Sequence, residues 1–169
     1  MFKQLIFIVS LSSISMNATI QLTSPAFSHN DQIPIKYTCD GSNVSPTLSW
    51  ANPPQATKSF ALIVDDPDAP KKVWVHWILF NIPAGVYTLK ENFNKVNKDN
   101  TYITGATDFD GEQKWGGPCP PSGKHRYHFT LYALDTMLDL PAGTKKEELI
   151  KAMEDHILEK TTLIGTYQR

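Results

Sequence analysis

The 169-residue sequence carries no excess of charge of either sign, since 16 Lys and Arg stand against 17 Asp and Glu, for a formal net charge of -1 at pH 7. This balance excludes a global field that would recruit nucleic acid or an anionic membrane, so any bound anion must be held by local groups. Internal repeats, heptads and low-complexity tracts are also missing. The length suits one domain with a sizeable core and is too short for two ordinary domains.

Long hydrophobic runs are scarce as well. The apolar stretch over residues 5–11 falls well short of the ~20 residues that a membrane-spanning helix needs, so we expect no transmembrane segment. Lys3 precedes this stretch and small residues up to Ala18 follow it, which is the layout of a secretory signal peptide, with a buried N-terminal strand as the alternative. We interpret residues 1–18 as a signal peptide and residues 19–169 as one exported domain, periplasmic or secreted.

Cysteine is nearly absent, with only Cys39 and Cys119 far apart in the chain. In a protein predicted to mature in an oxidising compartment, these two residues favour a single disulfide, and two unrelated buried thiols are the alternative. Closing a loop of about 80 residues would stabilise the fold by about 4.5 kcal/mol in the chain-entropy description of disulfides.

Short runs rich in β-branched and aromatic residues recur between turn-forming clusters, and they predict a mainly β domain. We expect strands at residues 33–37, 48–50, 60–64, 73–80, 102–104 and 127–134. Residues 144–147 have the form of a capping box and precede apolar residues at helical spacing up to Leu158, which predicts a C-terminal amphipathic helix. A last apolar run, residues 163–167, is expected to return to the sheet as a closing strand.

The first block of residues with chemical potential is a loop that leads into a strand. Prolines on either side of Asp68 stiffen this loop, so the carboxylates of Asp66 and Asp68 are presented on a rigid scaffold. In the strand that follows, period-two alternation predicts that His76 shares one face with Trp74, Ile78 and Phe80. This placement would give a histidine with aromatic neighbours.

The second block is a glycine- and proline-rich loop that leads into another strand. Gly116 and Gly117 allow a close backbone approach, so we expect their amides to point at a bound oxyanion. In the following strand, alternation places His125 and Tyr127 on the face that also carries Phe129. A histidine and a phenol hydroxyl would therefore arrive together at the mouth of an apolar strand.

These two blocks resemble the signatures of a known family. Asp66-Pro67-Asp68-Ala69-Pro70 with Trp74-x-His76, and Gly117-Pro118 with Gly123-x-His125-Arg126-Tyr127, are similar to the two signature blocks of the phosphatidylethanolamine-binding proteins, also called Raf kinase inhibitor-like proteins. The Gly-Gly-Pro-Cys-Pro-Pro form of the second block looks most like the bacterial branch. The resemblance implies a large central antiparallel sheet, a smaller sheet and a C-terminal helix.

The resemblance also implies a ligand pocket. The residues that match family positions around it are Asp66, Asp68, His76, Gly117, Pro118, His125 and Tyr127. Family members take phosphate-like groups and phospholipid head groups there, so we expect a binding protein for a small anionic ligand or a head group such as phosphoethanolamine, without a cofactor. An ionised Asp66 would repel an anion, so either the ligand brings a cation, or Asp66 is protonated or orients a histidine.

The sequence also bears on other function classes. A protein-interaction or inhibitor module with a kinase or protease partner is the main alternative, and a homodimer stays open. We predict no enzyme, because the sequence has no Gly-x-Ser-x-Gly elbow and nothing ties Ser122 to a base. We also predict no metal site, because His125 and His128 would point to opposite faces of one strand, and residues 108–111 lack the remaining ligands of a calcium loop.

Overall fold

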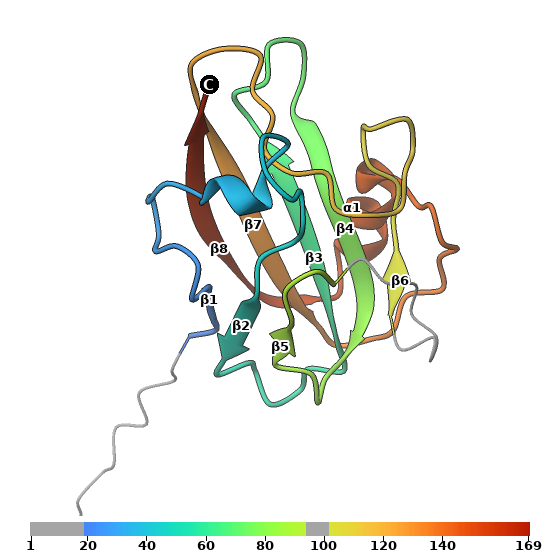
Figure 1. The fold of residues 1–169 in the computed structure, drawn as a ribbon. Helices are drawn as coiled ribbons and strands as arrows, with labels where there is room; N and C mark the ends of the chain where they lie inside the picture. The colour runs from blue at the N-terminus through green and yellow to red at the C-terminus, as the bar shows by residue number, and fades with distance from the viewer. Residues whose placement is uncertain (1–18, 94–101) are drawn as a thin grey trace, which may run out of the picture.

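The computed structural model describes residues 19–93 and 102–169, so the predicted signal peptide lies outside the described residues. Two antiparallel sheets make up the fold, which confirms the predicted mainly β class (Figure 1). The five-stranded sheet has the order β6 (Ile103–Thr104), β4 (Trp74–Pro83), β3 (Ser59–Asp66), β7 (Lys124–Leu134) and β8 (Ile157–Gln168). The three-stranded sheet has the order β1 (Gln21–Thr23), β2 (Leu48–Ala51) and β5 (Thr88–Leu89).

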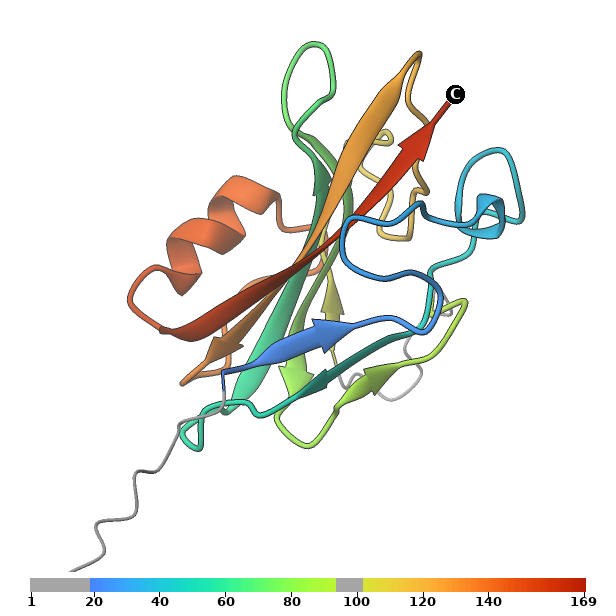
Figure 2. The ribbon, with the colours of Figure 1, turned by 90° about the vertical axis from the view of Figure 1, so that its left-hand side faces the viewer.

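The large sheet is covered on both faces. The smaller sheet packs on one face, where the Trp50 ring of β2 lies 5.4 Å from the Phe60 ring of β3. The single α-helix of the described residues, α1 (Lys146–Met153), covers the other face and buries Leu149 and Met153 against it. Figure 2 shows the helix and the small sheet on opposite sides of the large sheet. Because both faces are covered, the central strand β3 is buried along nearly its whole length.

Residues 33–37 do not form the predicted strand. Ile35–Tyr37 is instead a short 3-10 helix, η1. Apolar residues at alternate positions suggested a strand, but only Ile33 and Tyr37 are buried, whereas Ile35 is 59% exposed. Ile33 does donate its amide to the Thr166 carbonyl of β8, but the bridge there is isolated and continues into no strand. The strands β1 and β5 were not predicted, since both are too short to carry a pattern.

The C-terminal helix is shorter than predicted. It begins one residue later than the expected capping box, because the Lys145 amide donates to the Glu148 carboxylate (3.3 Å), while the Thr144 hydroxyl donates to a preceding carbonyl. The apolar residues 157 and 158 belong to β8 rather than to the helix. The described residues contain no helix with the length and apolar character needed to cross a membrane.

Cys39 and Cys119 form a disulfide across a sequence separation of 80 residues. It joins the loop after η1 to the loop before β7. The Cys39 amide also donates to the Pro118 carbonyl (3.1 Å). The pairing expected from the sequence is therefore present, and it fixes two distant loops side by side at one end of the large sheet.

Candidate functional site

A cavity of about 500 Å³ opens at the end of the large sheet where β3 leaves and β4 begins. Its lining comes from the β3–β4 loop, the start of β4, the segment around residue 109 and the loop before β7. The lining residues are Asp66, Ala69, Pro70, Lys71, Lys72, Trp74, His76, Phe109, Cys119 and Pro121. The two predicted blocks thus meet at one cavity, and Asp66 and His76 are the predicted residues that line it.

Asp66 is the buried acid of the cavity, with 3% of its surface exposed. One carboxylate oxygen accepts a hydrogen bond from the Asp68 amide (2.8 Å), and the other accepts from Nδ1 of His125 (2.7 Å). Asp66 and His125 come from the neighbouring strands β3 and β7, so the sheet itself brings them together. The carboxylate therefore orients His125, one of the roles considered from the sequence.

His76 is almost fully buried, and its ring makes a hydrogen bond to the loop before β7. Nδ1 donates to the Gly116 carbonyl (2.6 Å), and since a carbonyl can only accept, the proton of the neutral ring lies on Nδ1. Burial lowers the pKa of His76 below its ordinary value, against the opposing effects of the Gly116 carbonyl and the Asp66 charge. His76 is therefore a neutral side chain at neutral pH, and its Nε2 is an acceptor.

A β-bulge decides which way His76 points. His76 and Trp77 of β4 both lie opposite a single residue of β3, an arrangement that interrupts the alternation of side chains. As a result, the His76 ring lies 5.2 Å from the Tyr127 ring, while Ile78 and Phe80 pack on the other face with α1. The expectation that His76 shares a face with Ile78 and Phe80 is wrong.

Tyr127 lies behind His76 rather than in the cavity lining. His125 and Tyr127 do share one buried face of β7, as predicted. The Tyr127 side chain is fully buried, and its hydroxyl has no hydrogen-bond partner among the described residues. Burial raises the pKa of Tyr127 far above its usual range, and the Asp66 charge adds to this. The nearby Cys119 amide has a smaller, opposite effect on the pKa. The phenol therefore stays protonated.

The amides of the glycine-rich loop are already paired within the protein. Gly116 donates to the His76 carbonyl (3.0 Å), and Gly117 donates to the Asn43 side-chain oxygen (2.8 Å). A Cβ atom at Gly116 would lie 2.3 Å from the Phe109 ring, and one at Gly117 would lie 2.4 Å from Asn43. The glycines thus permit close packing, and the expectation that their amides point at a bound oxyanion is wrong. Pro118 helps to hold the same loop in place, because its carbonyl accepts a hydrogen bond from the Cys39 amide.

Asp68 also lies outside the cavity. Its carboxylate accepts two hydrogen bonds from the Arg126 guanidinium (2.6 and 2.8 Å) and one from the Arg126 amide (2.9 Å). These hydrogen bonds lower the pKa of Asp68 to about 2. Asp68 and His125 border a separate open depression with Ser122 and Lys124. Asp68 therefore fastens the β3–β4 loop to β7.

The walls of the cavity are aromatic, and one of them was not predicted. The rings of Trp74 and Phe109 meet edge to face at 5.7 Å, and Phe109 also lies 5.3 Å from the His76 ring. Phe109 comes from residues 108–111, which the sequence indicated only as an incomplete calcium loop, and no local pattern indicated its role. Gly116 leaves room for the Phe109 ring, since a Cβ atom there would lie 2.3 Å from it.

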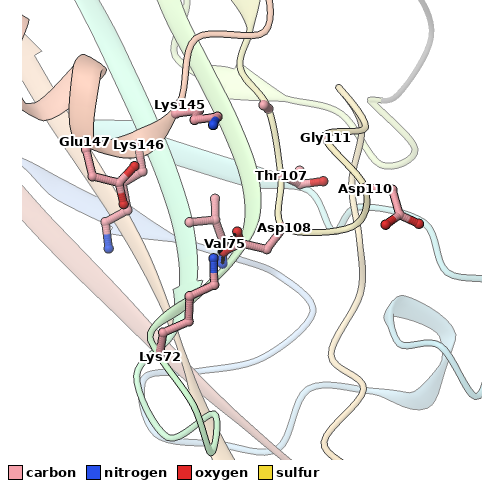
Figure 3. A pocket seen from close by; sticks show the side chains of 10 residues that line it. Lys72, Val75, Thr107, Asp108, Asp110, Gly111, Lys145, Lys146 and Glu147 are labelled. Atoms are coloured by element: carbon pink, nitrogen blue, oxygen red, sulfur yellow. Dashed lines mark hydrogen bonds and ion pairs between the residues drawn. The ribbon is translucent and has the colours of Figure 1, made fainter.

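A second, polar cavity of about 500 Å³ adjoins the first and shares Lys72 with it. Figure 3 shows the Lys72 ammonium turned toward the Asp108 carboxylate, which lies 2.6 Å away. Asp108 also accepts the Val75 amide (2.8 Å). Lys145 and Lys146, from the beginning of α1, border the far side. The ion pair of Lys72 with Asp108 therefore lies between the cavity with aromatic walls and the polar cavity, and the two charges compensate each other.

Comparisons with known proteins agree with this architecture. The family model for phosphatidylethanolamine-binding protein matches residues 23–168. An UPF0098 protein from Methanothermobacter thermautotrophicus is 50% identical over 151 residues, which cover 89% of this chain and 99% of the relative. Another UPF0098 protein, from Chlamydia muridarum, is 43% identical over 155 residues.

Solved structures give the same result. A phosphatidylethanolamine-binding protein homolog from Chlamydia trachomatis superimposes with a TM-score of 0.82 at 41% identity, covering 89% of this chain and 98% of that chain. YbcL of Escherichia coli, described as a member of the mammalian family, superimposes with a TM-score of 0.83 at 30% identity, covering 90% and 99%. The resemblance in the two sequence blocks thus extends over the whole described fold, and the chain belongs to the phosphatidylethanolamine-binding protein family.

Proposed function

We propose that the protein is an exported binding protein whose cavity beside Asp66 and His76 holds a small phosphate-bearing ligand, such as free phosphoethanolamine or the same group at the head of a phospholipid. The observation that carries this proposal is the convergence of a buried carboxylate, a buried neutral histidine and two aromatic walls on one cavity. Its volume of about 500 Å³ lies within the range of small-molecule sites. Membership of the family supports the ligand class.

The role proposed is binding rather than catalysis. Among the described residues, the cavity lining contains no hydroxyl group, and the cysteine in it, Cys119, is held in the disulfide. A serine, threonine, tyrosine or free cysteine nucleophile is therefore missing from the described lining.

Export is proposed on two grounds. The first is the leader layout of residues 1–18. The second is the disulfide, because structural disulfides persist mainly in oxidising compartments. Edman sequencing or intact mass of the protein recovered from the cell envelope would test the expected removal of the leader.

Calorimetric titration of the mature protein with phosphoethanolamine tests the binding function. We expect one ligand per chain, and we expect His76→Asn to weaken binding by at least about tenfold, which corresponds to about 1.4 kcal/mol. His156→Asn is the matched control, since this exposed histidine pairs with Asp135 away from the cavity. Absence of binding to the native protein, or equal losses in both variants, would contradict the proposal.

A further inference from the structure

The Cys39–Cys119 disulfide lies at the surface of the protein, because both of its cysteines are exposed residues. Exposed disulfides are the ones that thiols reach and reduce most readily, whereas most structural disulfides of secreted proteins resist reduction. The chain around Cys39 is also open, since residues 39–43 are all exposed. Cys119 stands instead between two buried prolines, Pro118 and Pro120. A thiol, including one carried by another protein, therefore approaches the bond more easily from the side of Cys39.

The two loops that the disulfide joins are also held together by hydrogen bonds. The Cys39 amide donates to the Pro118 carbonyl (3.1 Å), and the Gly117 amide donates to the Asn43 side-chain oxygen (2.8 Å). Neither hydrogen bond involves a sulfur atom. Reduction would therefore leave the two sulfurs close to each other, and the bond could form again.

A guanidinium group lies beside one of the two sulfurs. Nη1 of Arg169 donates to Sγ of Cys119 (3.7 Å). The backbone of Arg169 is held by two hydrogen bonds with Gly123 (3.1 and 3.3 Å), and its Nε forms an ion pair with Asp40 (3.1 Å). The guanidinium is thus fixed near Cys119 from both its backbone and its side chain.

This contact makes the two sulfurs unequal. A neighbouring Arg stabilises a thiolate, so negative charge is favoured on Cys119. Among the described residues, no cation contacts the sulfur of Cys39, and the residue that follows Cys39 is the acidic Asp40. In thiol–disulfide exchange, the sulfur that carries negative charge more easily is the one that leaves faster. Cys119 is therefore the better leaving group, and Cys39 is the sulfur that an incoming thiolate attacks.

Other charged groups near Cys119 do not reverse this difference. Lys71 and Lys72 line the same cavity as Cys119 and add to the attraction for a thiolate, whereas Asp66 opposes it. Asp66 is itself engaged, because its two oxygens accept hydrogen bonds from the Asp68 amide and the His125 ring. Arg169 is the group that touches the sulfur directly.

We propose that the Cys39–Cys119 bond is a site of thiol–disulfide exchange with a fixed direction. An incoming thiolate bonds to the Cys39 sulfur, the bond between Cys39 and Cys119 breaks, and Cys119 leaves as a thiolate beside Arg169. A second thiolate then attacks the incoming sulfur of this mixed disulfide and releases Cys39. Two thiols thus supply two electrons and become a disulfide, while the two protons that they lose pass to the released cysteines or to solvent.

The reduced protein differs chemically from the oxidised one at the cavity. Cys119 lines this cavity, so reduction replaces a bonded sulfur in its wall with a nucleophilic thiolate. Cys39 is not part of the described lining. The exchange site therefore has an outer sulfur that receives the thiol and an inner sulfur that becomes reactive.

The site of attack is measured with reduced glutathione. The mature oxidised protein is mixed with an excess of glutathione, quenched at early times with N-ethylmaleimide and mapped by peptide mass spectrometry. We expect glutathione on Cys39 and maleimide on Cys119, with the reverse pattern at least about fivefold less abundant. Equal or reversed patterns would overturn the direction of exchange. A bond that stays oxidised under a large excess of glutathione would overturn the exchange site itself.

A charge variant tests the role of Arg169. Arg169→Gln should slow the release of Cys119 by about threefold and reduce the preference for attack at Cys39. Lys124→Gln is the matched control, because it removes a positive charge at the same end of β7 and β8 without a contact to either sulfur. Equal effects of the two variants, or no effect of Arg169→Gln, would contradict the assignment to Arg169. Circular dichroism checks that both variants keep the fold.

Single-cysteine variants compare the two thiols without exchange. Cys39→Ser leaves Cys119 as a free thiol, and Cys119→Ser leaves Cys39. At pH 7 we expect iodoacetamide to alkylate Cys119 at least about threefold faster than Cys39, because Arg169 favours the thiolate of Cys119. Faster alkylation of Cys39 would contradict the inferred difference.

The source of the thiol is distinguished with a trapping protein. A thioredoxin-type protein whose second active-site cysteine is replaced by serine forms a mixed disulfide that it cannot resolve. A stable complex through Cys39 would identify a protein dithiol as a competent reductant. Reaction with glutathione alone would identify a small thiol. A complex through Cys119 would overturn the proposed direction.

Discussion

Strands β4 and β7 flank β3 on its two sides, and each supplies a histidine to the same site by a different rule. Along β7, every second side chain from His125 to Ala133 is buried, so simple alternation predicts where His125 points. Along β4, the bulge places His76 and Trp77 opposite one residue of β3 and turns His76 toward β7. Regular pairing therefore positions one histidine, and an irregularity positions the other.

The difference in burial between β7 and β4 explains why the direction of a side chain can be predicted from sequence in one strand and not in the other. In β7 the face away from the small sheet is partly exposed, so polar and apolar residues alternate visibly. In β4 both faces are covered, and residues 75–82 are all buried. A strand that is apolar on both faces has no alternation that a bulge could interrupt, so its sequence gives no sign of the bulge.

The largest expected effect comes from removing the Cys39–Cys119 disulfide, which holds the loop before β7 in place. The double variant Cys39→Ser with Cys119→Ser should lower the free energy of unfolding by about 2–5 kcal/mol, because the unfolded chain loses the constraint of a closed loop. Urea denaturation measures this loss, and an unchanged midpoint would contradict it.

The same variant separates the two histidines. His76 bonds to the Gly116 carbonyl, within the loop that the disulfide holds, whereas His125 bonds to Asp66 within the sheet. We expect the imidazole ¹⁵N resonances of His76 to shift more than those of His125. Equal shifts would show that the loop does not control His76 separately.

A smaller effect concerns the pH dependence of stability. The pKa of His76 is lower in the folded protein than its ordinary value near ~6.5, so below that value the unfolded state binds more protons than the folded state. Stability should therefore fall as the pH drops from 7 to 5. His76→Asn keeps an amide donor for the Gly116 carbonyl and cannot titrate, so the variant should lose less stability over this range. Urea midpoints at both pH values measure the difference, and parallel losses would contradict the assignment.

Much of the fold and part of the site could be predicted from the sequence. The β7 face, the disulfide and the meeting of two distant blocks followed from alternation, cysteine count and family resemblance. The pairing of Gly117 with Asn43 could not be predicted, because it joins a backbone amide to a side chain 74 residues away. Phe109 was missed for a similar reason, since a turn residue becomes a wall only through contacts with Trp74 and His76.

The smallest expected effect distinguishes two buried tyrosine hydroxyls. Tyr127 has no hydrogen-bond partner among the described residues, whereas the Tyr167 hydroxyl donates to Asp40 (2.8 Å). Tyr127→Phe should leave the free energy of unfolding unchanged or slightly higher, while Tyr167→Phe should lower it by about 1 kcal/mol. Because Tyr127 does not line the cavity, Tyr127→Phe should also leave the affinity for phosphoethanolamine unchanged. A clear loss of that affinity would mean that the ligand reaches past His76 to the Tyr127 hydroxyl on β7.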